Sequence, residues 1–142
     1  MLLQSVAGDF DIAARIKAAT GEALNAQYAL LGASVGTHGV WIGACGMATP
    51  MVLRVDESAD AINMTILPVN AQFFRIVRVG ADFLTFYSDL ANGPVTKADW
   101  KLLRPQVETA LGSDLASVGI AGMATDAGQM STVYWVRNEW PR

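Results

Sequence analysis

Charged residues are scarce in this chain. Asp, Glu, Lys and Arg together make up 16% of its 142 residues, against about 25% in an ordinary globular domain. Hydrophobic residues make up 52%, so the composition excludes intrinsic disorder, a charged coiled coil and a highly charged linker. A chain of this length can build one core of its own. We expect residues 1–142 to form a single domain whose surface is unusually neutral or partly covered by another molecule.

A surplus of basic residues is also missing. Lys and Arg number 10, Asp and Glu number 13, and the formal net charge is −3. Proteins that bind DNA or RNA use a positive patch to neutralise phosphates. Neither half of the chain contains a block of like charge. The charge balance therefore argues against a nucleic acid as the partner.

Cysteine and histidine occur once each. Cys45 has no second cysteine with which to form a disulfide or a zinc site, and we expect it to be a small buried hydrophobe. His38 lies in the run Gly36-Thr37-His38-Gly39. We expect it to be a turn residue, because the sequence places no nucleophile and no orienting acid beside it.

Long apolar runs are absent too. The mean hydropathy is +0.31, yet no stretch of about 18 apolar residues is free of a charge, glycine or proline. Insertion into a membrane is therefore not expected. The segment from Met1 to Gly8 lacks the basic start and long apolar core of a secretory signal peptide. The expected location is cytoplasmic or virion-associated.

The chain consists instead of short apolar segments bounded by turn residues. Residues 8–17 alternate apolar and polar side chains, which predicts a strand with Asp9, Asp11, Arg15 and Lys17 on its solvent face. Further strands are expected at 28–35, 40–43, 51–55, 61–67, 73–79, 82–88, 99–103, 117–124 and 131–136. Turn signals recur about every 8–12 residues, which predicts an antiparallel sandwich or barrel.

A tight hairpin and two helical alternatives complete this pattern. The hairpin is predicted at residues 79–82, where Gly80 supplies the positive φ that such turns require. An alanine-rich helix over residues 13–31 is one alternative to the strands predicted there. A helix over residues 101–111 is the other, although Pro105 interrupts it.

Several motifs follow one another along nearly the whole chain. They are Gly8-Asp9-Phe10, Leu31-Gly32, Phe74-Arg75-Ile76-Val77-Arg78-Val79-Gly80, Tyr87-Ser88-Asp89 with Trp100, and Val118-Gly119-Ile120-Ala121-Gly122-Met123-Ala124. In this order they resemble the concanavalin A-like lectin/glucanase superfamily, particularly its laminin-G-like and glycosidase-appended jelly-roll modules. The resemblance implies an all-β, antiparallel two-sheet β-sandwich. Phage or bacterial structural versions of such a module are among the forms we consider.

The chain departs from that superfamily in three ways. The segment from Leu90 to Asp99 lengthens a turn that relatives keep compact, and Trp100 after it is expected to close over one end of the sandwich. Only seven residues precede Gly8, so the first strand of the relatives is expected to be missing. The paired acids of catalytic relatives have no counterpart. Asp9 and Asp11 share a strand face, but hydrolysis needs two carboxyls about 5–10 Å apart with one pKa raised.

Aromatic and arginine side chains are the candidates for a binding site. Sugar-binding sandwiches stack flat rings on pyranose faces and surround them with planar polar groups. The predicted carbohydrate-binding residues are Trp41, Arg75, Arg78, Tyr87, Trp100, Trp135 and Arg137. For each ring the alternative is core packing, with Tyr134 and Trp135 on opposite faces of their strand. For each arginine the alternative is an ordinary solvent-facing charge.

No cofactor, metal or catalytic residue is expected. The acids of residues 56–60 form the best cluster for calcium, which some laminin-G-like relatives bind, but a solvated turn is the alternative that we favour. The resemblance implies a non-catalytic module that recognises carbohydrate. The alternative is a virion structural protein, a decoration, tail or fibre component, that packs against copies of itself or a shell. A glycoside hydrolase is the least supported hypothesis.

The expected partners follow from these hypotheses. They are a carbohydrate or other protein subunits, and a homo-oligomer or a larger assembly is expected. A sandwich with an open strand edge needs a partner strand or a symmetric neighbour to cover it.

Overall fold

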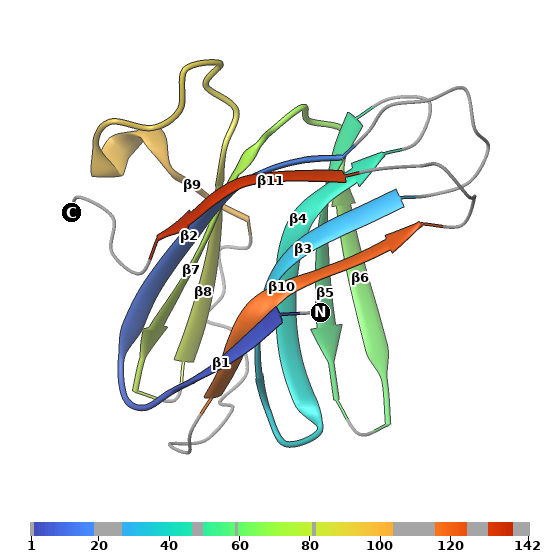
Figure 1. Ribbon diagram of the computed structural model, residues 1–142, viewed down its shortest axis with the longest axis vertical. Coiled ribbons are helices and arrows are strands. Elements are labelled where there is room, and N and C mark those ends of the chain that lie inside the picture. Colours follow the sequence, from blue (N-terminus) through green and yellow to red (C-terminus); the bar gives the residue numbers. More distant parts are fainter. Residues whose placement is uncertain are drawn as a thin grey trace.

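Two antiparallel sheets pack face to face in a computed structural model of the chain (Figure 1). The structure describes residues 2–18, 27–46, 50–58, 60–80, 82–103, 116–124 and 131–137. The predicted all-β, two-sheet antiparallel sandwich is thereby confirmed. Within the described residues, no helix is long and apolar enough to cross a membrane.

The first sheet, called sheet A, contains six strands. Their spatial order is β1 (Leu2–Val6), β10 (Ala116–Ala124), β3 (Gln27–Val35), β4 (His38–Gly46), β5 (Pro50–Glu57) and β6 (Ile62–Leu67). Sheet B contains five strands. Their order is β11 (Ser131–Arg137), β2 (Phe10–Ala18), β7 (Phe73–Val79), β8 (Asp82–Ser88) and β9 (Lys101–Leu102), with a 3-10 helix, η1 (Lys97–Asp99), between β8 and β9.

The alternation in the sequence determines which side chains enter the core. In β2, Ile12, Ala14 and Ile16 belong to the cluster of buried residues between the sheets. The intervening side chains lie on the outer face of sheet B, as predicted. The predicted hairpin is also present: β7 and β8 pair through a turn in which Gly80 has a φ of 62°.

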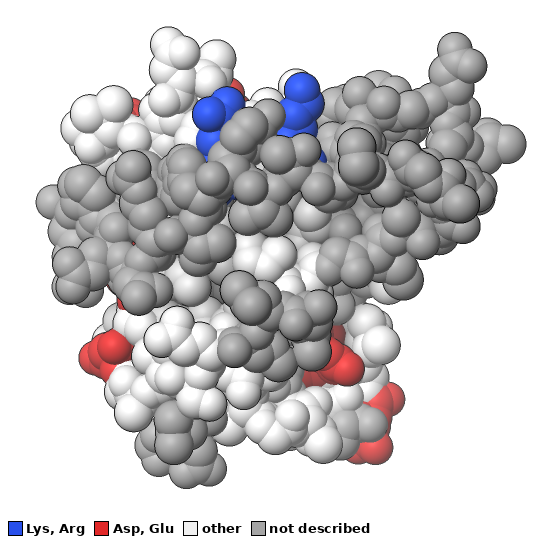
Figure 2. All heavy atoms as spheres, viewed as in Figure 1, with Lys and Arg blue, Asp and Glu red and all other residues white. Residues whose placement is uncertain are grey.

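The core between the sheets is aliphatic and rich in alanine. It consists of Ile12, Ala14, Ile16, Ala29, Leu31, Ala33, Val40, Ile42, Ala44, Val52, Ala71, Phe74, Ile76, Phe83, Leu103, Ala116 and Val118. Burial of these side chains accounts for much of the positive hydropathy without a membrane. On the face seen in Figure 2, the described charges stand in small separate groups, with Lys and Arg near the top and Asp and Glu lower down.

Two local predictions are wrong, and one alternative is not realised. Leu2–Val6 form β1 and pair with β10, so the strand expected to be missing before Gly8 is present. The alternative of an alanine-rich helix does not hold for residues 13–18 and 27–31, which belong to β2 and β3 as the favoured strand prediction had it, because cross-strand pairing outweighs local helix propensity. The strand predicted at 99–103 is only Lys101–Leu102, preceded by η1. Most of the alternative helix over 101–111 lies outside the described residues.

A charged side chain of sheet A is buried inside the sandwich. Arg54 points inward from β5 and has a relative exposure of 0%. Its Nε and Nη2 donate to the Asp56 carboxylate at 3.1 and 2.7 Å. Its Nη1 donates to the hydroxyl of Thr85 on β8. Arg54 therefore connects sheet A to sheet B, and its pairing offsets a desolvation cost of several kcal/mol.

We predict that Asp56→Ala lowers the free energy of unfolding by about 3–5 kcal/mol, because it leaves a buried guanidinium without its carboxylate. Urea denaturation measures the loss. The matched control is Asp89→Ala, which breaks the exposed pair with Lys101 and should change stability little. Equal effects of the two variants would contradict a stabilising role for the Arg54–Asp56 pair.

Candidate functional site

A second arginine is buried on the outer face of sheet B. Arg75 on β7 donates from Nε and Nη2 to the two carboxylate oxygens of Asp11 on β2, at 2.7 and 2.5 Å. The side chains are 7% and 3% exposed. Sequence reasoning placed both residues on a solvent face. Both side chains do lie on the outer face of sheet B, but the prediction that they are exposed to solvent is wrong.

The reason is a loop that folds back over this face. The covering loop, residues 89–100, contains η1 and ends at Trp100. Gly93 has a φ of 85° and lies directly against the ring of Phe73, where a Cβ would collide. Trp100 packs with Phe73 and Ala13 in a second apolar cluster. The prediction that Trp100 closes an end of the sandwich is therefore wrong, because it covers the outer face of sheet B.

The arginine is also held by aromatic rings. Arg75 Cζ lies 5.8 Å from the centroid of Phe86 and 5.5 Å from that of Trp100. At these distances a guanidinium is attracted to the ring faces. The ion pair and the two rings together restrict the guanidinium plane to one orientation.

A pocket of about 520 Å³ opens beside this arginine. We call it the Arg75 pocket. Apolar side chains line much of it, namely Val77, Val79, Leu84, Phe86 and Leu102, and Arg75, Arg78, Asp11 and Trp100 contribute the buried part of its wall. Two exposed charged residues, Asp9 and Lys97, also border it. The site therefore combines an apolar surface with a few fixed polar groups, as small-molecule sites usually do.

Hydrogen bonds within the covering loop hold it in place. Asp99 Oδ2 accepts from the backbone N–H groups of Val95 and Thr96 at 2.8 and 2.7 Å, which lowers the pKa of the Asp99 carboxyl. At the loop ends, Lys101 Nζ donates to Asp89 at 2.8 Å. This contact lowers the pKa of Asp89 and raises that of Lys101. Both interactions stabilise the loop that carries Trp100.

The structure brings some of the predicted site residues together and separates others. Arg75, Arg78 and Trp100 all border the Arg75 pocket. The guanidinium of Arg78 lies 5.3 Å from the Phe83 ring, and its Nε donates to the carbonyl of Gly80 at 2.9 Å. Arg78 is therefore buried as well, and the solvent-facing alternative is wrong for both arginines of β7.

The other predicted residues lie elsewhere. Tyr87 packs against the main core between the sheets. Trp41 lies on the outer face of sheet A, where its ring covers the backbone of Gly32 and leaves no room for a Cβ. Trp135 and Arg137 belong to β11, paired by backbone register with residues 15 and 13 of β2. Their side chains, like those of Tyr134 and Trp140, fall outside the described part of the structure.

Sequence reasoning missed several residues of the pocket. These are Asp11, Val77, Leu84, Phe86, Lys97 and Leu102. A signal was available in β8, where Leu84 and Phe86 alternate with the inward-facing Phe83 and Thr85. Apolar residues on both faces of a strand indicate that both faces are covered.

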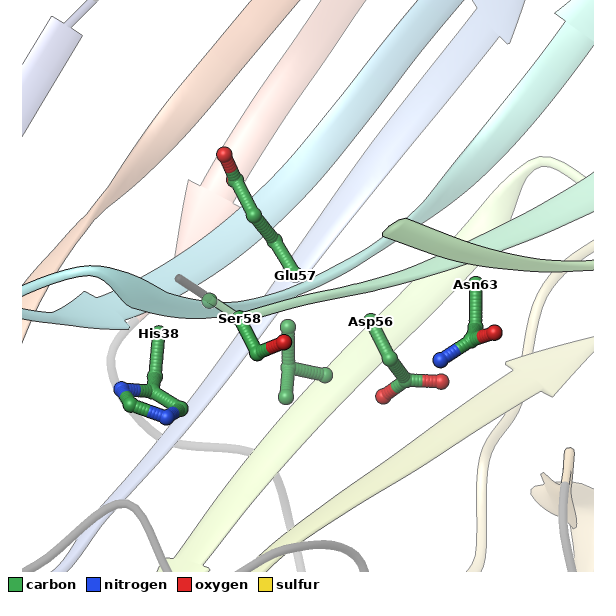
Figure 3. A pocket seen from close by; sticks show the side chains of 7 residues that line it. His38, Asp56, Glu57, Ser58 and Asn63 are labelled. Carbon is green, nitrogen blue, oxygen red and sulfur yellow. The ribbon is translucent and has the colours of Figure 1, made fainter. Parts of the chain in front are cut away.

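A smaller recess lies at the end of sheet A. It has a volume of about 210 Å³ and is lined by His38, Gly39, Val40, Asp56, Glu57, Ser58 and Asn63. Figure 3 shows that Glu57 points away from the side on which His38, Asp56 and Asn63 lie. Asp56 is already paired with Arg54. Among the described residues no group of three or more acids, histidines or cysteines could hold a metal ion, so the calcium ligands considered above are not assembled here.

Neither His38 nor Cys45 belongs to a described reactive group. His38 begins β4, directly after the turn, and Thr37 Oγ1 lies 3.5 Å from its Nδ1. The hydroxyl of Ser58 donates to the carbonyl of Ala61 at 3.3 Å. Cys45 is buried as predicted, and burial raises the pKa of its thiol. A raised thiol pKa disfavours the reactive thiolate.

Comparison with known proteins gives a fold and no function. No family model matches the chain, and no curated protein matches it. A crystal structure described as a functionally unknown protein from Saccharomyces cerevisiae is similar, with a TM-score of 0.69 and 14% sequence identity. The match covers 99% of this chain and 75% of the yeast chain. At this identity the similarity concerns the two-sheet fold alone.

We predict that Asp99 stabilises the protein in a pH-dependent way. Its pKa is lowered from 3.8 in the folded chain, so its contribution is present above that value and is lost as the pH falls through the lowered folded pKa. Urea denaturation between about pH 2 and pH 6 should therefore show an Asp99→Ala deficit that shrinks towards acid. Asp60→Ala, at an exposed position, is the control. A deficit that stays constant with pH would contradict this role.

Proposed function

We propose that the protein is a non-catalytic binding domain that recognises a carbohydrate in the Arg75 pocket. One observation carries the proposal. The Arg75 guanidinium is held by Asp11 and lies against Phe86 and Trp100, in a pocket whose wall is largely apolar. A rigid planar donor beside apolar surface suits a sugar ring, which has C–H faces and hydroxyl edges.

The Arg75 guanidinium has an N–H group left that can donate to a ligand. Arg75 uses Nε and Nη2 for Asp11, so Nη1 has no hydrogen-bond partner among the described residues. Lys97 and Asp9 at the pocket border add a donor and an acceptor for further hydroxyls. Because Arg75 is already fixed, binding does not have to order its side chain, and that lowers the entropic cost of association.

The carboxylates at the pocket favour binding over hydrolysis. Both oxygens of Asp11 accept hydrogen bonds from Arg75. Asp9 Oδ1 accepts from the backbone N–H of Gly80 at 2.7 Å. A glycosidase needs one carboxyl to donate a proton to the leaving group, whereas both acids serve here as hydrogen-bond acceptors. Membership of the concanavalin A-like superfamily is part of the same proposal, supported by the order of the sequence motifs.

The test is a glycan array followed by calorimetry on any sugar that binds. Val77→Trp places a large ring in the pocket and should weaken binding at least about tenfold, whereas Lys97→Ala should weaken it less. Trp41→Ala removes a tryptophan from the opposite sheet and should leave affinity unchanged. Thermal unfolding of each variant checks that it folds.

Three results would overturn the carbohydrate proposal. One is the absence of any bound glycan. Another is unchanged affinity in Val77→Trp, and the third is loss of affinity in Trp41→Ala alone. If the wild type hydrolysed chromogenic glycosides and Asp9→Asn abolished this turnover, the hydrolase hypothesis would replace that of a binding domain.

The alternative, a subunit that assembles with copies of itself, is favoured by a different observation. Sheet A carries an exposed apolar row along its edge strand β6, on the other sheet from the Arg75 pocket. The two hypotheses therefore concern separate surfaces and can both hold.

A further inference from the structure

Strand β6 exposes large apolar side chains to solvent. Ile62, Met64 and Ile66 are 60%, 62% and 49% exposed. They alternate along the strand and pair across it with Glu57, Val55 and Leu53 of β5, so they lie in one row on the outer face of sheet A. Among the described residues, no loop lies over these three side chains as the covering loop lies over sheet B. A contiguous apolar row of this kind marks an interaction surface.

The edge of the same strand that points away from β5 carries none of the residues that usually protect an edge. Strand β6 is the last strand of sheet A, at the right of that sheet in Figure 1, and among the described strands it pairs only with β5. Its sequence, Ile62-Asn63-Met64-Thr65-Ile66-Leu67, contains no charge, glycine or proline. Edge strands of monomeric proteins are usually blunted by charges, prolines or bulges, because unpaired backbone groups recruit other strands.

We propose that β6 pairs with β6 of a second copy of this chain, antiparallel and about a two-fold axis at Met64. Residues directly opposite in an antiparallel pair share a face. With the axis at Met64, each Met64 faces its counterpart and each Ile62 faces Ile66 of the other copy. All the exposed aliphatic side chains of the row then find apolar neighbours on the same face.

The other face of the strand is equally self-complementary. In this register Asn63 of each copy lies opposite Thr65 of the other, and an amide and a hydroxyl can hydrogen-bond to each other. A shift by one residue would place apolar side chains opposite polar ones. A shift by two would leave one isoleucine of each copy unpaired. The register centred on Met64 is therefore the one that pairs the whole strand.

Charge and symmetry favour a copy of this chain as the occupant. Because β6 is uncharged, the two-fold axis brings no like charges together. Asp60, just before the strand, would lie near Pro68 of the other copy and far from its own counterpart. A two-fold contact pairs the β6 edge of both copies and leaves neither edge available to a third copy. This contact therefore produces closed dimers and not fibres. The Arg75 pockets remain open, since they lie on the outer faces of the two B sheets.

The experiment is sedimentation of the whole chain over a range of concentrations. We expect the wild type to approach twice the 15.1 kDa chain mass, with an apparent Kd on the order of micromolar for so small an interface. The double variant Ile62→Lys/Ile66→Lys places lysine opposite lysine twice and should weaken dimerisation at least about tenfold. The exposed Val95 lies in the covering loop, so Val95→Lys is the matched single-charge control and should dimerise as the wild type does.

A charge swap tests the register itself. In Ile62→Glu/Ile66→Lys each glutamate faces a lysine of the other copy, so this variant should dimerise. Mixing Ile62→Lys/Ile66→Lys with Ile62→Glu/Ile66→Glu should produce heterodimers. These positions are exposed, so folding is expected to survive, and circular dichroism of each variant confirms it.

The proposal is overturned by a wild type that stays monomeric throughout the concentration range. It is overturned equally if Ile62→Lys/Ile66→Lys dimerises as well as the wild type. Failure of both the charge-swapped variant and the mixture would exclude the pairing centred on Met64. None of these outcomes bears on sugar binding in the Arg75 pocket, so the two proposals fail independently.

Discussion

A guanidinium buried between the sheets constrains how they pack. Arg54 comes from β5, and its hydrogen bonds reach Asp56 on its own strand and Thr85 on β8 of the opposite sheet. A buried guanidinium without partners costs several kcal/mol, so a sliding of the sheets that separated Arg54 from Thr85 would be unfavourable. This contact therefore helps to determine which side chains of β7 and β8 lie inside the sandwich and which lie on the outer face of sheet B.

The scarcity of charge in the sequence is greater still on the surface of the folded protein. Some of the few charged residues are largely or wholly shielded from solvent. Arg54 pairs with Asp56 between the sheets, and Arg75 pairs with Asp11 beneath the covering loop. Each pair satisfies hydrogen bonds where solvent is excluded. The surface is consequently even more neutral than the composition indicates, and its largest exposed side chains include the aliphatic residues of β6.

The two outer faces of the sandwich both carry apolar side chains, but these are covered to different extents. On sheet B, apolar side chains of β7 and β8 are partly covered by the loop that carries Trp100, and a pocket remains between loop and sheet. On sheet A, the row along β6 stays exposed, and among the described strands β6 pairs only with β5. A covered face with a pocket suits a small ligand, whereas an open apolar edge suits another strand. The proposed ligand site and the proposed self-association surface thus lie on different parts of one fold.

The sequence by itself determined the local structure. Alternation in residues 8–17 predicted β2 and the side chains that it buries, and β7, β8 and the Gly80 turn were predicted nearly to the residue, because period-2 patterns and a positive φ are local properties. Three of the residues selected from the sequence, Arg75, Arg78 and Trp100, border the Arg75 pocket. The tertiary structure alone decided which outward-facing residues meet solvent. Arg75 is buried because residues 89–100 fold back over it, and β1 forms because distant β10 offers it an edge. Such coverage depends on segments far apart in the chain, and no local pattern encodes it.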